Sequence, residues 1–578
     1  MKLTINRKYR IILILIDFLW LVTFISTDSF LSIYILCSFI ALFSILNLKG
    51  NDLILCRRNQ LLNGVYAILW SGAVIAANYL LFLPFNILNI VSLLIATIGG
   101  FTNAYVTLLF TELTIDRYRN SQHVSKENNC KNKRNTAFAF LFPFVFSCLV
   151  NLSYLFFSAY PGNLSPDSIS QIRQIITNEY SNHHPFWHTM LIKIFIDVGT
   201  YLFHDINAAV ALYSVFQVLL MAFIFAFMIM TLYEARIPNK VLAVISLFVV
   251  FSPYHIIYSV TMWKDIVFGG AVAAFLTFLF RIINDIGNKN CNFFGMFIFG
   301  LGFCLWRSNG FFAFSVTFII FSFTLFRNHN KVIICMATVM FFSYILKYPV
   351  IQALNVKQPD IAEFFSIPEQ QIARVIVENG NLTKTEVTLL SRVVDIERVK
   401  AEYRPWISDP IKEIMREKGL EYLSLHKTDY LKLWINVGIR NPKMYISAWI
   451  DQTKGYWNGG YRYWIWFQSI FDNEFGITRI SHQGSINSLF TSLFDMYYIS
   501  SYSEIFKSIG FTVWLTAMVL VIGIIRRNKN CILAIPGLVI ILSLLISTPV
   551  YSEFRYAYAI FTGFPIVILP AVFLKQTE

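Results

Sequence analysis

Long apolar runs separated by short polar connections make up most of this 578-residue chain. A helix that crosses a bilayer needs about 20 mostly apolar residues, and fourteen runs come close to that length or exceed it. The pattern therefore predicts an all-α polytopic membrane protein. The predicted spans are residues 11–27, 30–48, 63–83, 86–110, 137–157, 206–233, 241–260, 265–284, 292–306, 309–326, 331–348, 506–525, 531–549 and 556–574.

The first long polar interruption covers residues 160–188. Ser165 suits a helix N-cap and Pro166 suits the first helical position, so a helix is expected to begin there. Asp167 follows in its first turn, and a His-His-Pro turn lies at 183–185. The apolar positions are spaced as in a helix that lies on a membrane surface, and they are Ile169, Ile172, Ile175 and Ile176.

The stretch 187–203 comes next and is apolar, but Lys193 and Asp197 lie one helical turn apart within it. Because it also follows a proline, we expect a tilted or interfacial helix rather than a span.

Composition supports the membrane assignment, since 56% of the residues are hydrophobic and only 14% are charged. The net charge of +14 does not indicate nucleic acid binding, because residues 349–505 hold 17 basic and 18 acidic residues. The excess therefore lies in the membrane part, where basic loops set orientation. No cysteine falls within 349–505, so no disulfide is expected in that segment.

Basic residues recur at every second connection and predict that both termini are cytoplasmic in a multi-pass cell-membrane protein. This orientation leaves five segments on the outer face, which are 158–205, 261–264, 307–308, 349–505 and 550–555. Four regions follow from this division. They are a four-span addition (1–136), a membrane core with the first outer loop (137–348), an extracytoplasmic, mostly helical domain (349–505) and a three-span C-terminal part (506–578).

Several polar groups gather on the outer connections, and some are cations, against the usual charge bias. They are Asp167, His183, His184, Lys264, Asp265, Arg307, Asn309, Glu553 and Arg555. Lysine and arginine at such a rim suit an anionic ligand such as a lipid phosphate. A nearby carboxylate can take a proton from an attacking hydroxyl, and fixed cations stabilise a leaving phosphate. Together these groups indicate glycosyl transfer from a lipid-phosphate sugar.

Each group also has a purely structural explanation. Asp167 complements a helix dipole, and Lys264 and Arg307 each follow a tryptophan and suit snorkelling at the interface. The histidines suit a turn better than a metal site, because no Cys or spaced His partner lies near. The aromatic run 456–467 also fits an interface belt. Motifs for nucleotide binding and zinc proteolysis are absent from the sequence.

The ordered set of motifs resembles the GT-C superfamily of integral-membrane glycosyltransferases, in a bacterial branch with an HHP first outer loop. The motifs are YPGNLSPDS, then HHP, WKD, RSNG and a late EFRY, with YRPWISDPIK (403–412) and the 441–457 stretch in the outer domain. The resemblance covers roughly residues 137–574. It implies a GT-C-like fold, an outer active site, a polyprenyl-phosphate sugar donor and a catalytic acid at Asp167. The loop has one acid rather than a pair, which leaves a divalent-metal requirement open.

On this hypothesis the protein is an inverting glycosyltransferase in which Asp167 is the base or orients the acceptor. Lys264, Arg307 and Arg555 hold the donor phosphate, with Asp265, Asn309 and Glu553 in support. His183 and His184 are the other candidate catalytic residues, and they shape the donor pocket or bond to the leaving phosphate. The acceptor, which is an envelope glycan, a lipid or a protein, is expected to stack on aromatic residues of the outer domain, namely Trp457, Tyr461 and Trp464.

A transporter of lipid-linked sugars and a polysaccharide polymerase remain alternatives. Transporters place ionisable groups near the bilayer midplane, whereas here most charges gather at the outer rim. Asp17 in the first span is the exception. A sensor or scaffold would leave the outer polar groups without a function.

Overall fold

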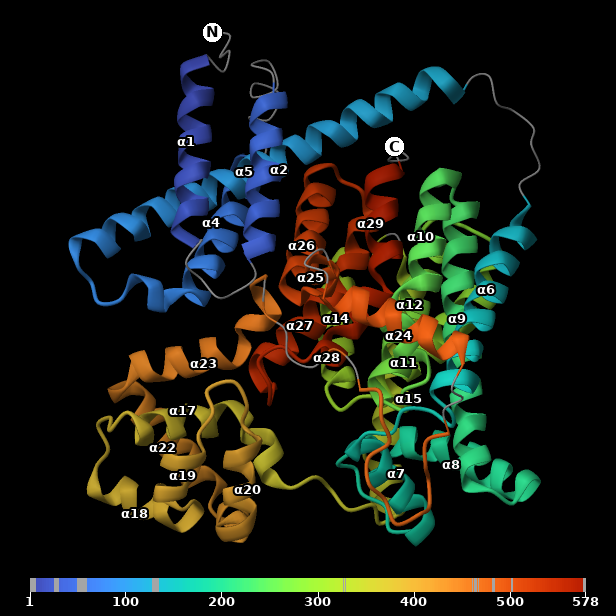
Figure 1. The fold of residues 1–578 in the computed structure, drawn as a ribbon, viewed down its shortest axis with the longest axis vertical. Helices are drawn as coiled ribbons and strands as arrows, with labels where there is room; N and C mark the ends of the chain where they lie inside the picture. The colour runs from blue at the N-terminus through green and yellow to red at the C-terminus, as the bar shows by residue number, and fades with distance from the viewer. Residues whose placement is uncertain are drawn as a thin grey trace.

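A computed structural model describes residues 7–24, 31–48, 60–126, 135–325, 327, 329–459, 461, 465, 467–480, 484–499 and 503–574. Within these ranges the protein is built of helices, and the only β-type pairings are isolated bridges. Figure 1 shows three regions, an N-terminal bundle, a membrane core and a helical domain at the opposite end from the N-terminus.

The N-terminal bundle consists of α1 (Arg7–Phe24), α2 (Leu31–Asn47), α4 (Gln60–Ala77) and α5 (Ile87–Lys126), with a short 3-10 helix η2 (Tyr79–Phe82). The fourth predicted span was expected to end at 110, before a loop. This expectation was wrong, because α5 continues to Lys126 as one 40-residue helix. Figure 1 shows α5 running obliquely past α1 and α2.

The membrane core packs around α12 (Lys264–Ile283), in which 89% of the span is buried. It contacts α9 (Ile206–Glu234) and α13 (Lys289–Leu305). Outside these, α6 (Thr136–Ser158) packs on α9, and α14 (Gly310–Leu325) and α15 (Asn330–Lys347) pack on α13. The C-terminal part adds α26 (Ile509–Ile525), η4 (Lys529–Leu533), α27 (Ala534–Ser547), α28 (Phe554–Thr562) and α29 (Phe564–Phe573). The contact between α12 and α28 brings the start of one span beside the start of the other.

One predicted span, 241–260, is broken into α10 (Asn239–Phe251) and α11 (Pro253–Ser259), bent by 52°. Pro253 explains the break, since it lacks a backbone N–H and suits the first position of a new helix. Among the described residues, eight helices are long and apolar enough to cross a membrane, or nine with this bent pair. The protein is therefore an all-α membrane protein.

The helical domain, which the sequence predicts to be extracytoplasmic, begins at α16 (Pro349–Ala353) and ends at α23 (Pro442–Trp457). Between them lie η3 (Ile361–Phe365), α17 (Ser366–Val377), α18 (Lys384–Val393), α19 (Ile396–Glu402), α20 (Asp409–Lys418), α21 (Leu420–Leu425) and α22 (Lys427–Arg440). These short amphipathic helices bury a core of their own, which includes Ile372, Val375, Val399, Ile414, Tyr430 and Val437. The domain therefore has the separate core that a folding unit needs.

The chain then returns from this domain to the membrane core. Residues 467–480 run along the loop 158–205, the predicted first outer loop, where Leu164 N donates to Ser469 O (3.1 Å) and Phe471 N donates to Leu164 O (2.8 Å). The next helix, α24 (Ser485–Ile499), packs on α6 and α11, and the rings of Phe490 and Phe494 contact Tyr154. A short helix, α25 (Ser503–Lys507), leads into α26. The segment 349–505 thus contains a domain and a return segment that packs on the membrane core.

Candidate functional site

The helix that carries Asp167, α7 (Pro166–Thr177), begins where the sequence indicates. Ser165 is its N-cap and forms a capping box with Ser168, and Pro166 opens the helix. The cap is also bonded to the next outer connection, because Trp263 Nε1 donates to Ser165 Oγ (2.7 Å) and Ser168 Oγ donates to Met262 O (2.8 Å). These bonds fix the first turn of α7 beside the start of α12.

The isoleucine stripe of α7 does not lie on lipid as expected. Ile169, Ile172 and Ile175 are buried against α8 (Phe186–Phe203) and α9, where they contact a cluster that includes Ile192 and Tyr213. Ile176 alone of the four is exposed. The stripe therefore anchors α7 to protein and fixes the direction in which Asp167 points.

Asp167 accepts hydrogen bonds from two cations that come from distant parts of the chain. Its Oδ2 lies 2.9 Å from Arg555 Nη1 and 3.2 Å from Lys264 Nζ. Burial raises the pKa of the Asp167 carboxyl, but Lys264 and Arg555 outweigh it and hold the pKa well below its usual value. Asp167 is therefore ionised at neutral pH.

His184 completes this cluster. Its Nδ1 lies 3.1 Å from Lys264 Nζ, and burial, followed by the charge of Lys264, lowers the pKa of the imidazole well below its ordinary value. The ring is thus neutral at pH 7, and its Nδ1 can accept a hydrogen bond from the ammonium group. Lys264 is held between a carboxylate and a neutral imidazole.

Arg555 is packed between aromatic rings at the start of α28. Its guanidinium carbon lies 4.7 Å from the Trp263 ring centroid and 5.2 Å from that of Tyr556. Glu553 Oε1 lies 3.4 Å from Arg555 Nε, without the alignment of a good hydrogen bond. Burial raises the pKa of Glu553 to about 7, although Arg555 acts in the opposite direction. Glu553 is therefore the carboxyl in this cluster that titrates near neutrality.

Arg307 and Asp265 form a second pair, behind Tyr556. Arg307 Nε lies 3.1 Å from Asp265 Oδ1, and Asp265 is completely buried. Arg307 Nη1 also donates to Tyr556 O (2.6 Å), and its guanidinium carbon lies 4.4 Å from the Tyr556 ring centroid. Arg307 thus positions the backbone next to Arg555. The charge of Arg307 is already paired with that of Asp265. Asn309 binds Ser543 Oγ (2.7 Å) on α27.

His183 faces the outer domain. Its Nδ1 lies 4.0 Å from Glu363 Oε1, and Glu363 in turn pairs with Lys412 (3.1 Å) and with Arg416. Sequence reasoning missed these three residues. In the sequence they look like the charged face of ordinary amphipathic helices, and no motif singles them out. They link the first outer loop to η3 and α20.

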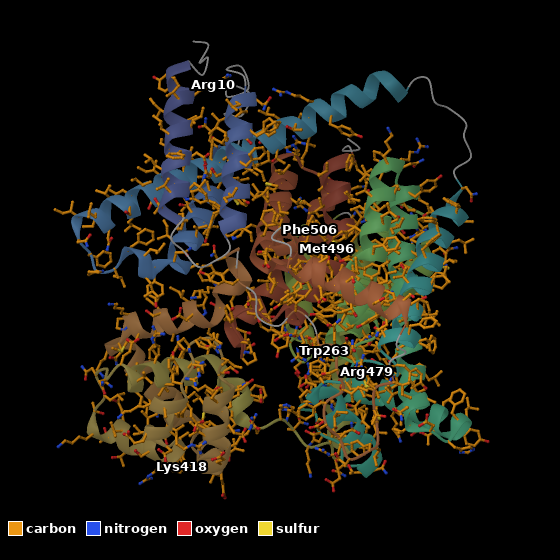
Figure 2. The ribbon with its side chains drawn as sticks, viewed as in Figure 1. Arg10, Trp263, Lys418, Arg479, Met496 and Phe506 are labelled. Carbon is orange, nitrogen blue, oxygen red and sulfur yellow. The ribbon has the colours of Figure 1, made fainter. Side chains whose placement is uncertain are left out.

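Arg479 was also missed. It lies in the return segment and donates to Ser158 O (3.2 Å), Gly162 O (3.2 Å) and Asn163 Oδ1 (2.7 Å). One guanidinium therefore holds the beginning of the first outer loop. Figure 2 labels Arg479 below Trp263 and near α7.

The three residues expected to bind an acceptor are placed differently from one another. Trp457 is nearly buried, with its ring against Trp449 (centroids 6.0 Å apart), so it packs in the core. Tyr461 lines a hollow together with Trp406 and Tyr551. Trp464 lies outside the described residues.

These contacts define an anion-binding geometry. Lys264 and Arg555 converge on one carboxylate oxygen, and a phosphate oxygen can take the same position as an acceptor. A cavity of about 210 Å³ adjoins the site between α8, α15 and the 358–364 segment, lined by residues that include Trp187, Arg307 and Lys347. Within the described residues, no three His, Cys, Asp or Glu side chains lie close enough to hold a metal ion.

The comparisons with known proteins place most of the chain in one family. The model of the family DUF6020, described as a family of unknown function, matches residues 176–578. No curated protein and no solved structure matches the chain. The matched stretch contains Lys264, Arg307 and Arg555 but begins after Asp167.

Proposed function

The chain belongs to DUF6020, and we propose that it is a glycosyltransferase that moves a sugar from a polyprenyl-phosphate donor to an acceptor on the extracytoplasmic face. One observation carries this proposal, the convergence of Lys264 and Arg555 on the Asp167 carboxylate. It supplies both an anion site and a base in one place. The outer domain, linked to the same loop through His183, supplies room for an acceptor.

In the proposed reaction, oxygens of the donor phosphate take the hydrogen bonds that Lys264 and Arg555 now make to Asp167. The acceptor hydroxyl attacks the anomeric carbon, the bond from that carbon to the phosphate oxygen breaks, and polyprenyl phosphate leaves with the bonding electrons. The anomeric configuration is inverted. Asp167 accepts the hydroxyl proton, and the two cations stabilise the leaving phosphate.

Donor binding would also strengthen the base. The two cations lower the pKa of Asp167 in the free protein. When a phosphate takes up their charge, the buried carboxylate loses that stabilisation and its proton affinity rises. The base would thus become effective only when the donor is in place, which limits wasteful proton transfer. His184 would keep Lys264 in position throughout.

The proposed topology is GT-C-like with fourteen spans, cytoplasmic termini and an outer active site. In support, each of the fourteen predicted spans corresponds to a described helix or to two consecutive ones. Four of these helices are apolar but shorter than a full span, and α1 carries several charges. The active-site groups also lie at the same ends of α12 and α28, because both helices begin at the cluster.

Asp17 favours a second candidate function, transport of a lipid-linked sugar. This acid is buried inside the N-terminal bundle, where Ser38 Oγ donates to its Oδ2 (2.9 Å). An ionisable group within a membrane bundle is costly and is often part of a transport path. A flip assay in proteoliposomes would separate this candidate from the enzyme.

The test of the proposed function uses the full chain, purified in detergent, and Asp167→Ala beside it. Both receive polyprenyl-phosphate sugars and a mixed acceptor pool, and release of polyprenyl phosphate is followed by mass spectrometry. We expect release by the wild type and none by the variant. Asp197→Asn is a matched control, because Asp197 is an exposed carboxylate on α8, paired only locally with Lys193 (3.0 Å) in the structure. Equal release by the wild type and Asp167→Ala would contradict the proposal.

A further inference from the structure

A second hollow is lined by residues other than those of the charged cluster. Its volume is about 410 Å³, and its lining residues are Pro405, Trp406, Asp451, Lys454, Tyr461 and Tyr551. Pockets of about 300–1,000 Å³ with apolar walls and a few polar groups are typical of small-ligand sites. No step of the proposed reaction uses these residues.

The walls of this hollow come from two chain segments that pair as a short antiparallel bridge. Ile407 pairs with Val550, and Tyr551 N donates to Trp406 O (3.0 Å). Trp406 and Tyr551 are next to the paired residues, so both side chains leave the bridge on the same face. The outer domain and the loop 548–553 thus each contribute one aromatic wall.

The floor of the hollow is held rigidly by α23. Gly455 N donates to Tyr551 O (3.1 Å), and a Cβ at Gly455 would meet Ser552 Cβ at 2.1 Å. Only a glycine permits this approach, so the helix carrying Asp451 and Lys454 is pressed directly on the loop. The aromatic and polar walls are therefore preorganised.

The polar groups of the hollow nearly cancel in charge. Asp451 pairs with Lys454 (3.0 Å) and with Arg374 (2.9 Å), and Arg374 also pairs with Glu378. The lining itself thus holds one cation, Lys454, and one carboxylate, Asp451, and the site offers hydrogen bonds without a strong preference for an anion. This arrangement distinguishes it from the cluster at Asp167.

The aromatic groups offer apolar faces at angles to one another. The Tyr461 and Tyr551 ring centroids lie 6.3 Å apart at 74°, and Lys454 Nζ lies 5.3 Å from the Tyr461 centroid. The Trp406 side chain is 45% exposed. Flat apolar rings beside hydrogen-bonding groups suit a ligand with C–H faces and a hydroxyl rim. A neutral pyranose has both.

One wall residue of the hollow, Tyr551, is close in sequence to Glu553 and Arg555. Tyr551 and Glu553 are two residues apart, so their Cα atoms are at most about 7 Å from each other. Glu553 Oε1 lies 3.4 Å from Arg555 Nε, and Nη1 of the same guanidinium binds Asp167. The loop 548–553 therefore spans the distance between the hollow and the anion site.

We propose that this hollow binds a neutral hexopyranose unit of the acceptor, so that the acceptor is a glycan. This inference rests on the proposed glycosyl transfer for its role, but the binding site stands on the geometry of the hollow. Trp406, Tyr551 and Tyr461 form its walls, and Asp451 and Lys454 bind hydroxyl groups. Trp457, which packs in the core, does not line it.

The binding test uses the full chain in detergent and saturation-transfer NMR. The probes are the methyl glycosides of glucose, galactose, mannose, N-acetylglucosamine and N-acetylgalactosamine. We expect at least one to show a transfer signal that falls about fivefold or more in Trp406→Ala, since the stacking surface is lost, and that Trp406→Tyr partly retains. Phe471→Ala is the control, because Phe471 is an exposed outer ring that does not line this hollow. No signal from any glycoside, or equal signals in Trp406→Ala and wild type, would overturn the site.

The kinetic test separates this inference from the proposed function. If transfer occurs, Trp406→Ala should raise the acceptor KM about tenfold while kcat and the donor KM change by less than about twofold. A fall in kcat with an unchanged acceptor KM would overturn the assignment to acceptor binding. If the wild type releases no polyprenyl phosphate, the proposed function fails, whereas the glycoside signals still report on the hollow.

Discussion

Arg555 Nη1 donates to Asp167 Oδ2 at 2.9 Å, although the two residues are 388 positions apart in the chain. Even a partly buried ion pair of this kind seldom adds much net stability, because desolvation of both charges opposes their attraction. Lys264 and Arg555 also bring two positive charges to one negative charge. The excess positive charge is what an anionic substrate would neutralise.

Replacing Asp167 by Asn should reduce kcat by about a hundredfold or more, because a general base contributes at least that factor. The amide keeps the size of the side chain but cannot accept the proton. Steady-state transfer assays on the purified protein measure this change. Asp197→Asn should remain within about twofold of wild type, and a similarly small effect in Asp167→Asn would exclude the base assignment.

Replacing Arg555 by Lys should weaken donor binding although the charge is retained. A lysine cannot reproduce the planar group that lies by Trp263 and Tyr556, and it lacks the second donor near Glu553. We expect the donor KM to rise about tenfold or more. Arg173→Lys is the matched control, since Arg173 is an exposed arginine on α7 that pairs with Glu474. An unchanged donor KM in Arg555→Lys would show that the phosphate binds elsewhere.

Donor affinity should depend on pH through Glu553. Its pKa is raised to about 7 by burial, so above pH 7 the ionised carboxylate lies beside Arg555 and competes with the donor phosphate. The donor KM should therefore rise as the pH increases through about 7. Glu553→Gln should abolish this part of the profile. A wild-type profile that Glu553→Gln leaves unchanged would assign the titration to another group.

The same carboxyl affects stability with a defined sign. In the folded protein it keeps its proton to about pH 7, whereas a carboxyl in the unfolded chain loses it near about 4.3. Its contribution to the free energy of unfolding is therefore complete below about pH 4.3 and is lost as the pH rises through about 7. Thermal unfolding of Glu553→Gln in detergent should be less pH-dependent than that of wild type in this window.

Breaking the Arg307–Asp265 pair should destabilise the fold. Arg307→Met leaves Asp265 buried without its cation, and loss of one partner of a buried pair costs about 3–5 kcal/mol. A thermal-shift measurement should show a lower Tm. The double variant Arg307→Met with Asp265→Leu should recover much of the loss, since neither charge then remains buried. A double variant as unstable as the single one would mean that the Tyr556 contacts of Arg307 dominate.

Local features of the site could be predicted from sequence because short-range chemistry determines them. Ser165 and Pro166 mark the start of α7, and the span pattern places Lys264 and Arg555 at the ends of helices that begin on the same side. Pairings across the chain could not be predicted in this way. Nothing in the pattern around Arg307 shows that Asp265 neutralises it, or that Arg479 binds the first outer loop.

The contacts of the aromatic run 456–467 could not be predicted from sequence either. Hydrophobic spacing treats Trp457 and Tyr461 alike, but Trp457 faces the core and Tyr461 faces a hollow. The difference depends on Trp449 and Tyr551, which contact them from different elements. Sequence therefore identified the aromatic cluster, and only the three-dimensional packing separated its members.

The separation of Asp167 from Arg555 also has a consequence for biosynthesis. At about 5–20 residues per second, a ribosome needs roughly 20–80 s to make the 388 residues between them. During this interval Asp167 has been synthesised but Arg555, its second cationic partner, has not. The cluster of Asp167, Lys264 and Arg555 therefore cannot be assembled as the first loop emerges, and it is completed only after α28 has been made. Premature termination before α28 would leave a polypeptide in which Asp167 lacks Arg555.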